Sequence, residues 1–180
     1  MNVLGMDPGF ASLGWAVLSL DGDAVQLVAM GIIRTKKDTR KQSVLASDDN
    51  LVRAREISRA LQALCDKHRI AVICSESMSY PRNAAAAAKV AITWGVLAAI
   101  SEMRKLPVVQ ASPQQVKKRT AGSVTASKLE ISAHVKKVFG KSEVESFLSG
   151  APATQHEHAL DAAAVVLACL DSEVLRMARG

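Results

Sequence analysis

The sequence contains little cysteine and few aromatic residues. Its three cysteines, Cys65, Cys74 and Cys169, are widely spaced and include no Cys-x-x-Cys pair. An odd number of scattered thiols argues against a disulfide scaffold or a zinc knuckle and favours a reducing compartment such as the cytoplasm. Aromatic residues make up only 3% of the chain, which disfavours a protein that binds single strands by stacking many bases.

Long apolar runs are missing as well. The longest stretch, 90–100, is interrupted by Thr93 and Gly95 and is shorter than the roughly 20 residues that cross a membrane. The N-terminus has no basic segment followed by an apolar core and a small-residue cleavage site, so we expect no signal peptide. With 180 residues and 49% hydrophobic content, the chain is expected to fold as one domain over 1–180 without a membrane partner.

Acidic residues are outnumbered by basic ones, which gives a formal net charge of +6. A basic domain is weak evidence for nucleic-acid binding, because many basic proteins bind none. The basic residues gather in one segment that holds a single acid, Glu130; they are Lys117, Lys118, Arg119, Lys128, Lys136, Lys137 and Lys141. Each lysine alone could belong to a solvated helix face, but such a cluster favours sequence-independent contact with phosphates.

The order of apolar patterns and turn residues predicts an α/β fold. We expect strands over 3–6, 13–20, 24–33, 70–74 and 108–110, and helices over 51–68, 83–105, 114–120, 127–138 and 155–176. The first three strands are joined by short turns, which indicates antiparallel pairing, whereas the later strands alternate with helices. This order predicts a mixed five-stranded sheet with helices on its faces.

Two carboxylates stand at matching places in this scheme. Asp7 follows the first strand in MDPG, and Glu76 follows the fourth in ICSE. Singly, the first could be a turn acid and the second a solvated strand end. If the two strands are neighbours, however, the carboxylates lie side by side and repel each other, and a divalent cation such as Mg²⁺ would relieve that repulsion.

A third polar group opens the last predicted helix in QHEHALD. His158 and Asp161 are three residues apart and Glu157 and Asp161 are four apart, so both pairs share a helix face. The spacing leaves open which of the two joins Asp161. Glu157 also fits a capping box with Thr154, in which it would bind the helix N-terminus. Together with Asp7 and Glu76, these residues form the pattern of a two-metal nuclease.

Several segments, taken in order, resemble the RuvC-type Holliday junction resolvases of the ribonuclease H-like fold. The matching segments are MDPGFASLGWAVL, GIIRTKK, ICSE, RNAAAAAKVAITWGVLAAI, QVKKRTAGSVTASKLEI and EHALDAAAVVLA. The resemblance implies a homodimeric endonuclease that nicks four-way DNA junctions symmetrically in recombination and repair. It places Asp7, Glu76, His158 and Asp161 at a site for two Mg²⁺ ions, with His158 at a position that is Asp in some members and His in others. Because imidazole binds Mn²⁺ better than Mg²⁺, Mn²⁺ is expected to substitute.

The resemblance also implies DNA contacts and shows two departures. Its basic segment contains Lys117, Lys118, Arg119 and Lys128. After the second acid, where the family has an aromatic residue that reaches the junction centre, this chain has Ser79, followed by Tyr80 and Arg82 as candidate DNA-binding residues. The connection 34–50 is also longer than usual. These features suggest a divergent member, acting in the cytoplasm or in an organellar or viral-host compartment; any helicase partner is unknown.

Three alternatives remain at this point. A broader nuclease for flaps and three-way junctions would use the same site. A non-catalytic junction-binding module would be expected to have lost at least one metal acid, whereas Asp7, Glu76 and Asp161 are all present. An acid-Gly ATPase would need a second glycine-rich phosphate loop, and 70–77 contains no glycine.

Overall fold

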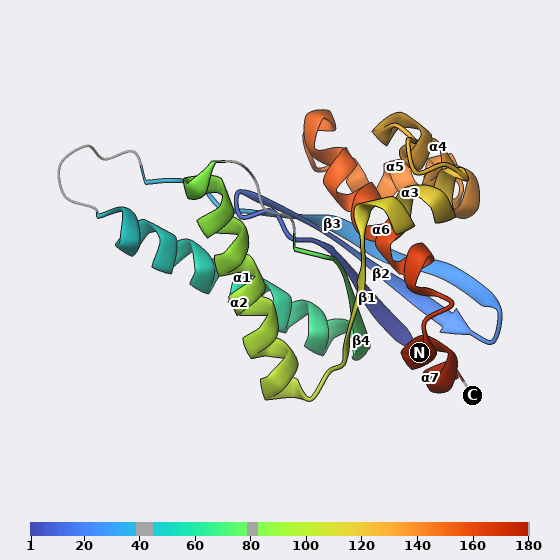
Figure 1. The fold of residues 1–180 in the computed structure, drawn as a ribbon, viewed down its shortest axis with the longest axis horizontal. Coiled ribbons are helices and arrows are strands. Elements are labelled where there is room, and N and C mark those ends of the chain that lie inside the picture. Colours follow the sequence, from blue (N-terminus) through green and yellow to red (C-terminus); the bar gives the residue numbers. More distant parts are fainter. Residues whose placement is uncertain (39–44, 79–82, 180) are drawn as a thin grey trace.

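The computed structural model describes residues 1–38, 45–78 and 83–179 (Figure 1). Its centre is a five-stranded sheet in the order β3-β2-β1-β4-β5. The strands are β1 (Asn2–Asp7), β2 (Ser12–Asp21), β3 (Ala24–Arg34), β4 (Ile70–Glu76) and β5 (Val108–Ala111). β1, β2 and β3 pair antiparallel, while β4 is parallel to both β1 and β5. The predicted mixed sheet is therefore confirmed.

Helices cover both faces of this sheet. They are α1 (Ala46–His68), α2 (Ala84–Arg104), α3 (Pro113–Ala121), α4 (Lys128–Phe139), α5 (Lys141–Leu148), α6 (His156–Cys169) and α7 (Glu173–Arg179). Figure 1 shows α1 and α2 on one side of the sheet and the group α3 to α6 on the other. Alternation along β1 explains this, since Val3 belongs to the core under α6 and Leu4 to the core under α1 and α2.

Three of the five predicted helix starts are explained by side-chain caps. The side chain of Asn83 accepts a hydrogen bond from the backbone N–H of Ala86 at the start of α2. Ser112 and Ser127 each form a complete capping box at the starts of α3 and α4. Such caps satisfy backbone donors within one turn, so the sequence alone specifies where these helices begin.

The helices differ from the prediction in three places. Helix α1 begins at Ala46, earlier than expected, because Asp48 and Asp49 favour the first turn of a helix. Helix α5 was not predicted; it buries Val144 and Leu148 after a turn at Gly140, whose φ is 86°. The last predicted helix is two helices, because α7 restarts with Ser172, whose hydroxyl accepts a hydrogen bond from the backbone N–H of Leu175.

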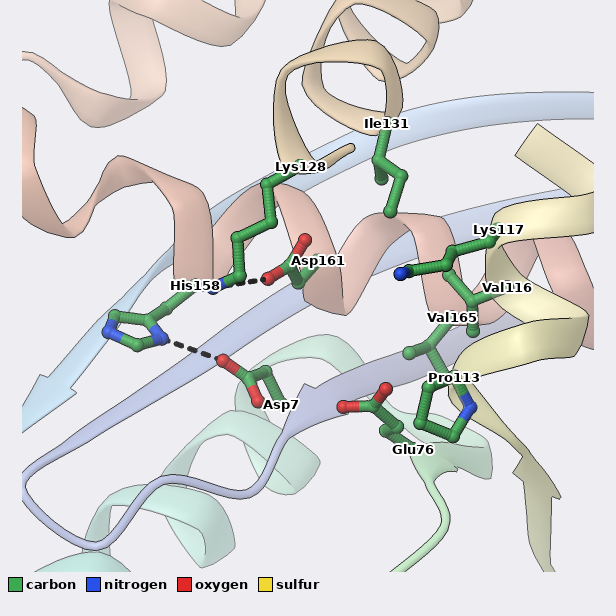
Figure 2. Close-up of a pocket in the computed structure, with 10 residues that line it drawn as sticks. All are labelled: Asp7, Glu76, Pro113, Val116, Lys117, Lys128, Ile131, His158, Asp161 and Val165. Atoms are coloured by element: carbon green, nitrogen blue, oxygen red, sulfur yellow. Dashed lines mark hydrogen bonds and ion pairs between the residues drawn. The ribbon is translucent and has the colours of Figure 1, made fainter. Parts of the chain in front are cut away.

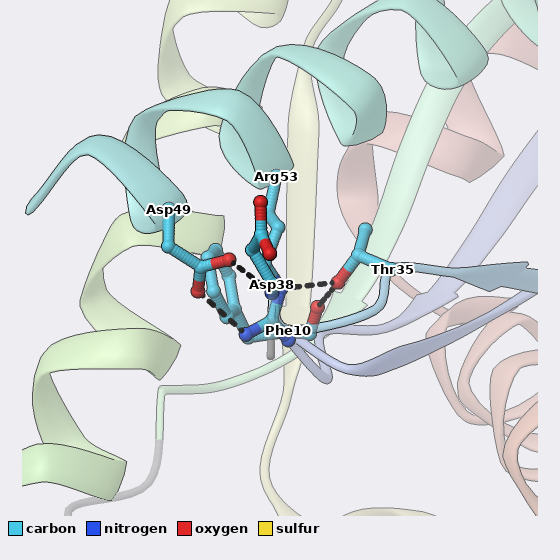
Figure 3. A network of polar contacts seen from close by, with 5 residues as sticks. All are labelled: Phe10, Thr35, Asp38, Asp49 and Arg53. Atoms are coloured by element: carbon cyan, nitrogen blue, oxygen red, sulfur yellow. Dashed lines mark hydrogen bonds and ion pairs between the residues drawn. The ribbon is translucent and has the colours of Figure 1, made fainter. Parts of the chain in front are cut away.

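A buried polar network ties α1 to the turn after β1 (Figure 3). The guanidinium of Arg53 lies 4.4 Å from the centroid of the Phe10 ring, and its Nε donates to the Thr35 hydroxyl at 2.9 Å. That hydroxyl donates to the carbonyl of Phe10 at 2.7 Å. Asp49 accepts from Arg53 and from the backbone N–H of Asp38. The network therefore joins α1 and Thr35, directly after β3, to Phe10 in the turn that follows Asp7.

Helix α2 exposes an apolar surface. Within the part of the chain that the structure describes, it is the one helix whose length and composition would allow it to cross a membrane, with a mean hydropathy of 1.6 over its best 18-residue window. By length and composition, therefore, the expectation that no segment is long enough to cross a membrane does not hold. Thr93, Leu97 and Ile100 are buried, and Ile92, Trp94 and Val96 pack partly against the same core. The opposite face, which carries mainly alanines, is exposed.

Candidate active site

The ends of β1 and β4 bring two of the predicted acids together. The parallel register pairs Met6 with Ser75, so Asp7 and Glu76 follow at adjacent positions one residue further along each strand. Both side chains point to the face covered by α6, because side chains alternate along a strand and Val3 and Cys74 belong to the core on that face. The condition under which the sequence placed the two carboxylates side by side, that their strands are neighbours, is therefore met.

Helix α6 brings the other two predicted residues to the same place. It crosses β1 and β2 so closely that a Cβ added at Gly14 would stand 2.8 Å from the backbone nitrogen of Ala159, and closer still to the carbonyl oxygen of His158. Glycine is therefore required at this position of β2. The close approach sets His158 and Asp161, in the first two turns of α6, directly over the end of β1.

These side chains line a cavity of about 330 Å³ (Figure 2). Its lining consists of Asp7, Glu76, Pro113, Val116, Lys117, Lys128, Ile131, His158, Asp161 and Val165. The structure thus brings together all four predicted metal-site residues and two of the predicted DNA-binding lysines. The apolar wall from α3, α4 and α6 was not predicted, since its residues are indistinguishable from core positions in the sequence.

Other predicted DNA-binding residues lie elsewhere. Lys118 and Arg119 line a separate hollow on α3, and Arg119 forms an ion pair of 2.7 Å with Asp171. Tyr80 and Arg82 lie outside the described residues. The four candidate DNA-binding residues that the structure describes are therefore divided into two groups. Lys117 and Lys128 line the cavity, and Lys118 and Arg119 lie on the adjoining surface of α3.

The carboxylates in the cavity are electrostatically strained. Burial, together with the charges of Asp7 and Asp161, raises the pKa of Glu76 to about 7. Burial and the charge of Asp7 raise the pKa of Asp161 to about 6, although Lys128 opposes this shift. The charge of Asp7 thus raises the pKa values of both Glu76 and Asp161, and three acids gathered in one cavity create a demand for positive charge.

His158 contacts Asp7 directly. Its Nδ1 lies 2.7 Å from Oδ2 of Asp7 (Figure 2). This hydrogen bond raises the pKa of His158, although burial acts in the opposite direction. With Nδ1–H as the donor, the neutral ring has Nε2 as its free acceptor, which is the nitrogen that could bind a metal or take a proton.

Glu157 does not line the cavity and does not form the capping box. The N-cap position of α6 is Gln155, without a side-chain cap, and Thr154 lies in the preceding 3₁₀ turn Ala153–Gln155. Instead, Oε2 of Glu157 lies 3.2 Å from Nζ of Lys128. The capping interpretation of Glu157 is therefore wrong, because the 3₁₀ turn displaces the helix start.

The donor set suits a hard divalent cation. Among residues 1–38, 45–78 and 83–179, no three His, Cys, Asp or Glu side chains lie close enough together to form a ready-made metal cluster. The chemistry of the cavity nevertheless fits such an ion, because carboxylate oxygens are the ligands that Mg²⁺ prefers and their mutual repulsion is what the ion would remove.

A mixed five-stranded sheet flanked by helices, with acids at adjacent parallel strand ends and on a crossing helix, defines a nuclease of the ribonuclease H-like class. The chain belongs to the crossover junction endodeoxyribonuclease RuvC family, whose model matches residues 3–169. Membership of this family implies dependence on a divalent metal ion.

Individual relatives cover most of the chain. The RuvC endonuclease of Nitrobacter hamburgensis is 30% identical over 168 residues, which are 92% of this chain and 94% of that protein. The Pseudothermotoga lettingae protein is 30% identical over 136 residues, or 76% of this chain and 78% of its own length. Thermus thermophilus RuvC in complex with a Holliday junction substrate has a TM-score of 0.76 at 24% identity, covering 99% and 97% of the two chains. The yeast mitochondrial Holliday junction resolvase Ydc2 has a TM-score of 0.66 at 15% identity, covering 98% of this chain and 82% of that one.

Proposed function

We propose that this chain is a divalent-metal-dependent endonuclease that resolves four-way DNA junctions by paired, symmetric nicks. The observation that carries the proposal is the convergence of Asp7, Glu76, His158 and Asp161 on one cavity beside Lys117 and Lys128. Family membership supports the choice of a four-way junction as substrate.

Four side chains would hold the metal. Asp7, Glu76, His158 and Asp161 would bind two Mg²⁺ ions, and the imidazole of His158 makes Mn²⁺ a good substitute. When bound, such ions would supply the positive charge that activates a water and stabilises the leaving 3′ oxygen. The hydrogen bond between Nδ1 of His158 and Asp7 orients the ring, which leaves Nε2 free and supports a role in which it would bind an ion or accept a proton from the attacking water.

The basic residues would hold the DNA. Lys117 and Lys128 line the cavity itself, where they can approach the phosphate that is cut. Lys118 and Arg119 on the adjoining surface can contact neighbouring phosphates. Contacts of this kind hold the backbone without reading bases, as a structure-selective enzyme requires.

The exposed surface of α2 supports a homodimer. This helix is rich in alanine and buries few of its residues within the chain. Small residues allow two helices to pack closely across a twofold axis, and a second copy would remove their apolar surface from water. Two sites related by such an axis would match the twofold symmetry of a four-way junction.

The test is cleavage of a mobile and a static four-way junction beside flap, three-way and duplex substrates, in Mg²⁺ and then in Mn²⁺. We expect paired nicks at symmetric positions in the four-way junctions and little cutting of the duplex. Equal cutting of flaps and three-way junctions would instead indicate a broader branched-DNA nuclease.

The matched control is Asp7→Asn. Removing this charge should abolish cleavage in either metal while leaving junction binding intact, because Asp7 binds the metal and not the DNA. Retained cleavage by this variant would overturn the assignment of the site.

A further inference from the structure

Glu157 forms an ion pair that the proposed reaction does not use. It lies in the first turn of α6, outside the cavity lining. Its Oε2 is 3.2 Å from Nζ of Lys128, and the same ammonium lies 3.7 Å from Oδ2 of Asp161. Lys128 is therefore shared between one carboxylate that lines the cavity, Asp161, and one that does not, Glu157.

Lys128 needs such a partner to stay where it is. It is the first residue of α4, where the positive end of the helix dipole repels a cation. Its side chain is 60% exposed and would otherwise sample many rotamers in water, because a lysine has four flexible carbon–carbon bonds. The two carboxylates on α6 oppose both effects.

The two carboxylates would not contribute equally during the reaction. Asp161 is one of the proposed metal-binding residues, and a divalent cation bound to it would repel the ammonium of Lys128. Glu157 lies outside the cavity and would keep its charge available. Glu157 is thus the partner that can hold Lys128 while the site is loaded.

We propose that Glu157 is a positioning residue that holds the Lys128 ammonium at the mouth of the active-site cavity, where it contacts the phosphate to be cut. This inference rests on the proposed function. It assigns Glu157 a role through Lys128, and not as a helix cap or as a third metal ligand.

The first experiment is a double-mutant cycle on the single-turnover cleavage of a four-way junction. Glu157→Gln keeps the shape of the side chain and removes its charge, and Lys128→Met removes the ammonium. We expect Glu157→Gln to slow cleavage about two- to five-fold, the range of an exposed ion pair, and to have no further effect in the Lys128→Met background. Slowing by the same factor in both backgrounds would show that Glu157 acts directly, as a metal ligand would, and an unchanged or faster rate would also overturn the proposal.

The second readout is junction binding in EDTA, which separates positioning from loss of structure. Removing a negative charge near DNA should leave affinity unchanged or slightly higher, whereas a variant with a damaged fold should bind more weakly. A loss of affinity in Glu157→Gln greater than that in Lys128→Met would contradict the positioning role, because Glu157 is proposed to act only through the Lys128 ammonium. The matched control is Glu145→Gln, which breaks the 3.4 Å ion pair between Glu145 and Lys136 at the far end of α4 and should change neither rate nor affinity.

A third readout does not depend on cleavage. NMR order parameters of the lysine Cε–H bonds should fall at Lys128 in Glu157→Gln and stay unchanged there in Glu145→Gln. Equal order at Lys128 in the wild type and in Glu157→Gln would refute the proposal even if the protein cut no junction. Absence of cleavage by the wild type would count against the proposed function alone.

Discussion

Replacing Gly14 by alanine is expected to disturb both the fold and the active site. The new Cβ would stand 2.8 Å from the backbone nitrogen of Ala159, where ordinary van der Waals contact begins at 3.4 Å, and it would overlap the carbonyl oxygen of His158. Both atoms belong to the backbone of α6, so no side-chain rotation can relieve the overlap. The helix or β2 must move instead.

The expected losses of stability and of activity in Gly14→Ala follow from this displacement. Overpacking a well-packed core costs about 1–3 kcal/mol, and a clash with backbone belongs at the upper end of that range. A shift of about 1 Å in α6 would lengthen the 2.7 Å contact between His158 and Asp7, and misplacement of that size can reduce catalysis about 100-fold. We therefore expect Gly14→Ala to lose more activity than its stability loss explains.

The assay combines urea denaturation with single-turnover cleavage at a temperature where the variant is still folded. The control is Gly150→Ala, because nothing lies within 4 Å of a Cβ at that position and its φ is not positive. Gly150→Ala should match the wild type in both measurements. A Gly14→Ala variant with the wild-type midpoint and the wild-type rate would refute the argument that this glycine lets α6 reach the sheet.

Further predictions concern charge. Replacing Lys117 and Lys118 together by Met should weaken junction binding and reduce the slope of log affinity against log salt by about 2 if each contacts one phosphate; an unchanged slope would exclude that role. Because the pKa of Glu76 in the folded protein is about 7, above its ordinary value of 4.5, its contribution to stability is full below pH 4.5 and is lost as the pH rises through 7. Glu76→Gln should therefore raise the melting temperature in EDTA at pH 8 by about 2–4 °C and have less effect at pH 5. The same rise at both pH values would contradict the conclusion that burial raises the pKa of Glu76. Arg53→Met removes a buried guanidinium and should cost about 3–5 kcal/mol in urea denaturation, whereas exposed Arg55→Met should cost little; equal costs would show that the network is unimportant.

Local signals in the sequence predicted most of the framework. Asn83, Ser112 and Ser127 begin helices because each satisfies backbone donors within its own first turn. The short connections between the first three strands required antiparallel pairing, and the helical crossover before the fourth strand allowed a parallel one. These features placed Asp7 and Glu76 at strand ends, but the pairing of β1 with β4 that makes them adjacent is shown by the structure.

Signals that depend on distant segments were missed or misread. Glu157 satisfied the spacing of a capping box, but its partner is Lys128, 29 positions earlier in the chain. Arg53 is one of several charged residues interleaved with apolar ones in the predicted helix 51–68, yet it is buried against Phe10 and Thr35. No periodicity distinguishes these arginine or glutamate residues from solvated ones, because their partners come from other elements.

By itself, the sequence determined the order of the elements, the helix caps and the strand ends that carry the first two acids, because these depend on interactions within a few residues. Only the tertiary structure decided that α6 crosses the sheet at Gly14, that His158 and not Glu157 faces the cavity, and that Lys128 is held between Glu157 and Asp161. The physical reason is that the packing of α6 against the sheet decides which face of the helix is turned to the cavity. Side chains in its first turn therefore face either the cavity or solvent, and their spacing in the sequence does not distinguish the two.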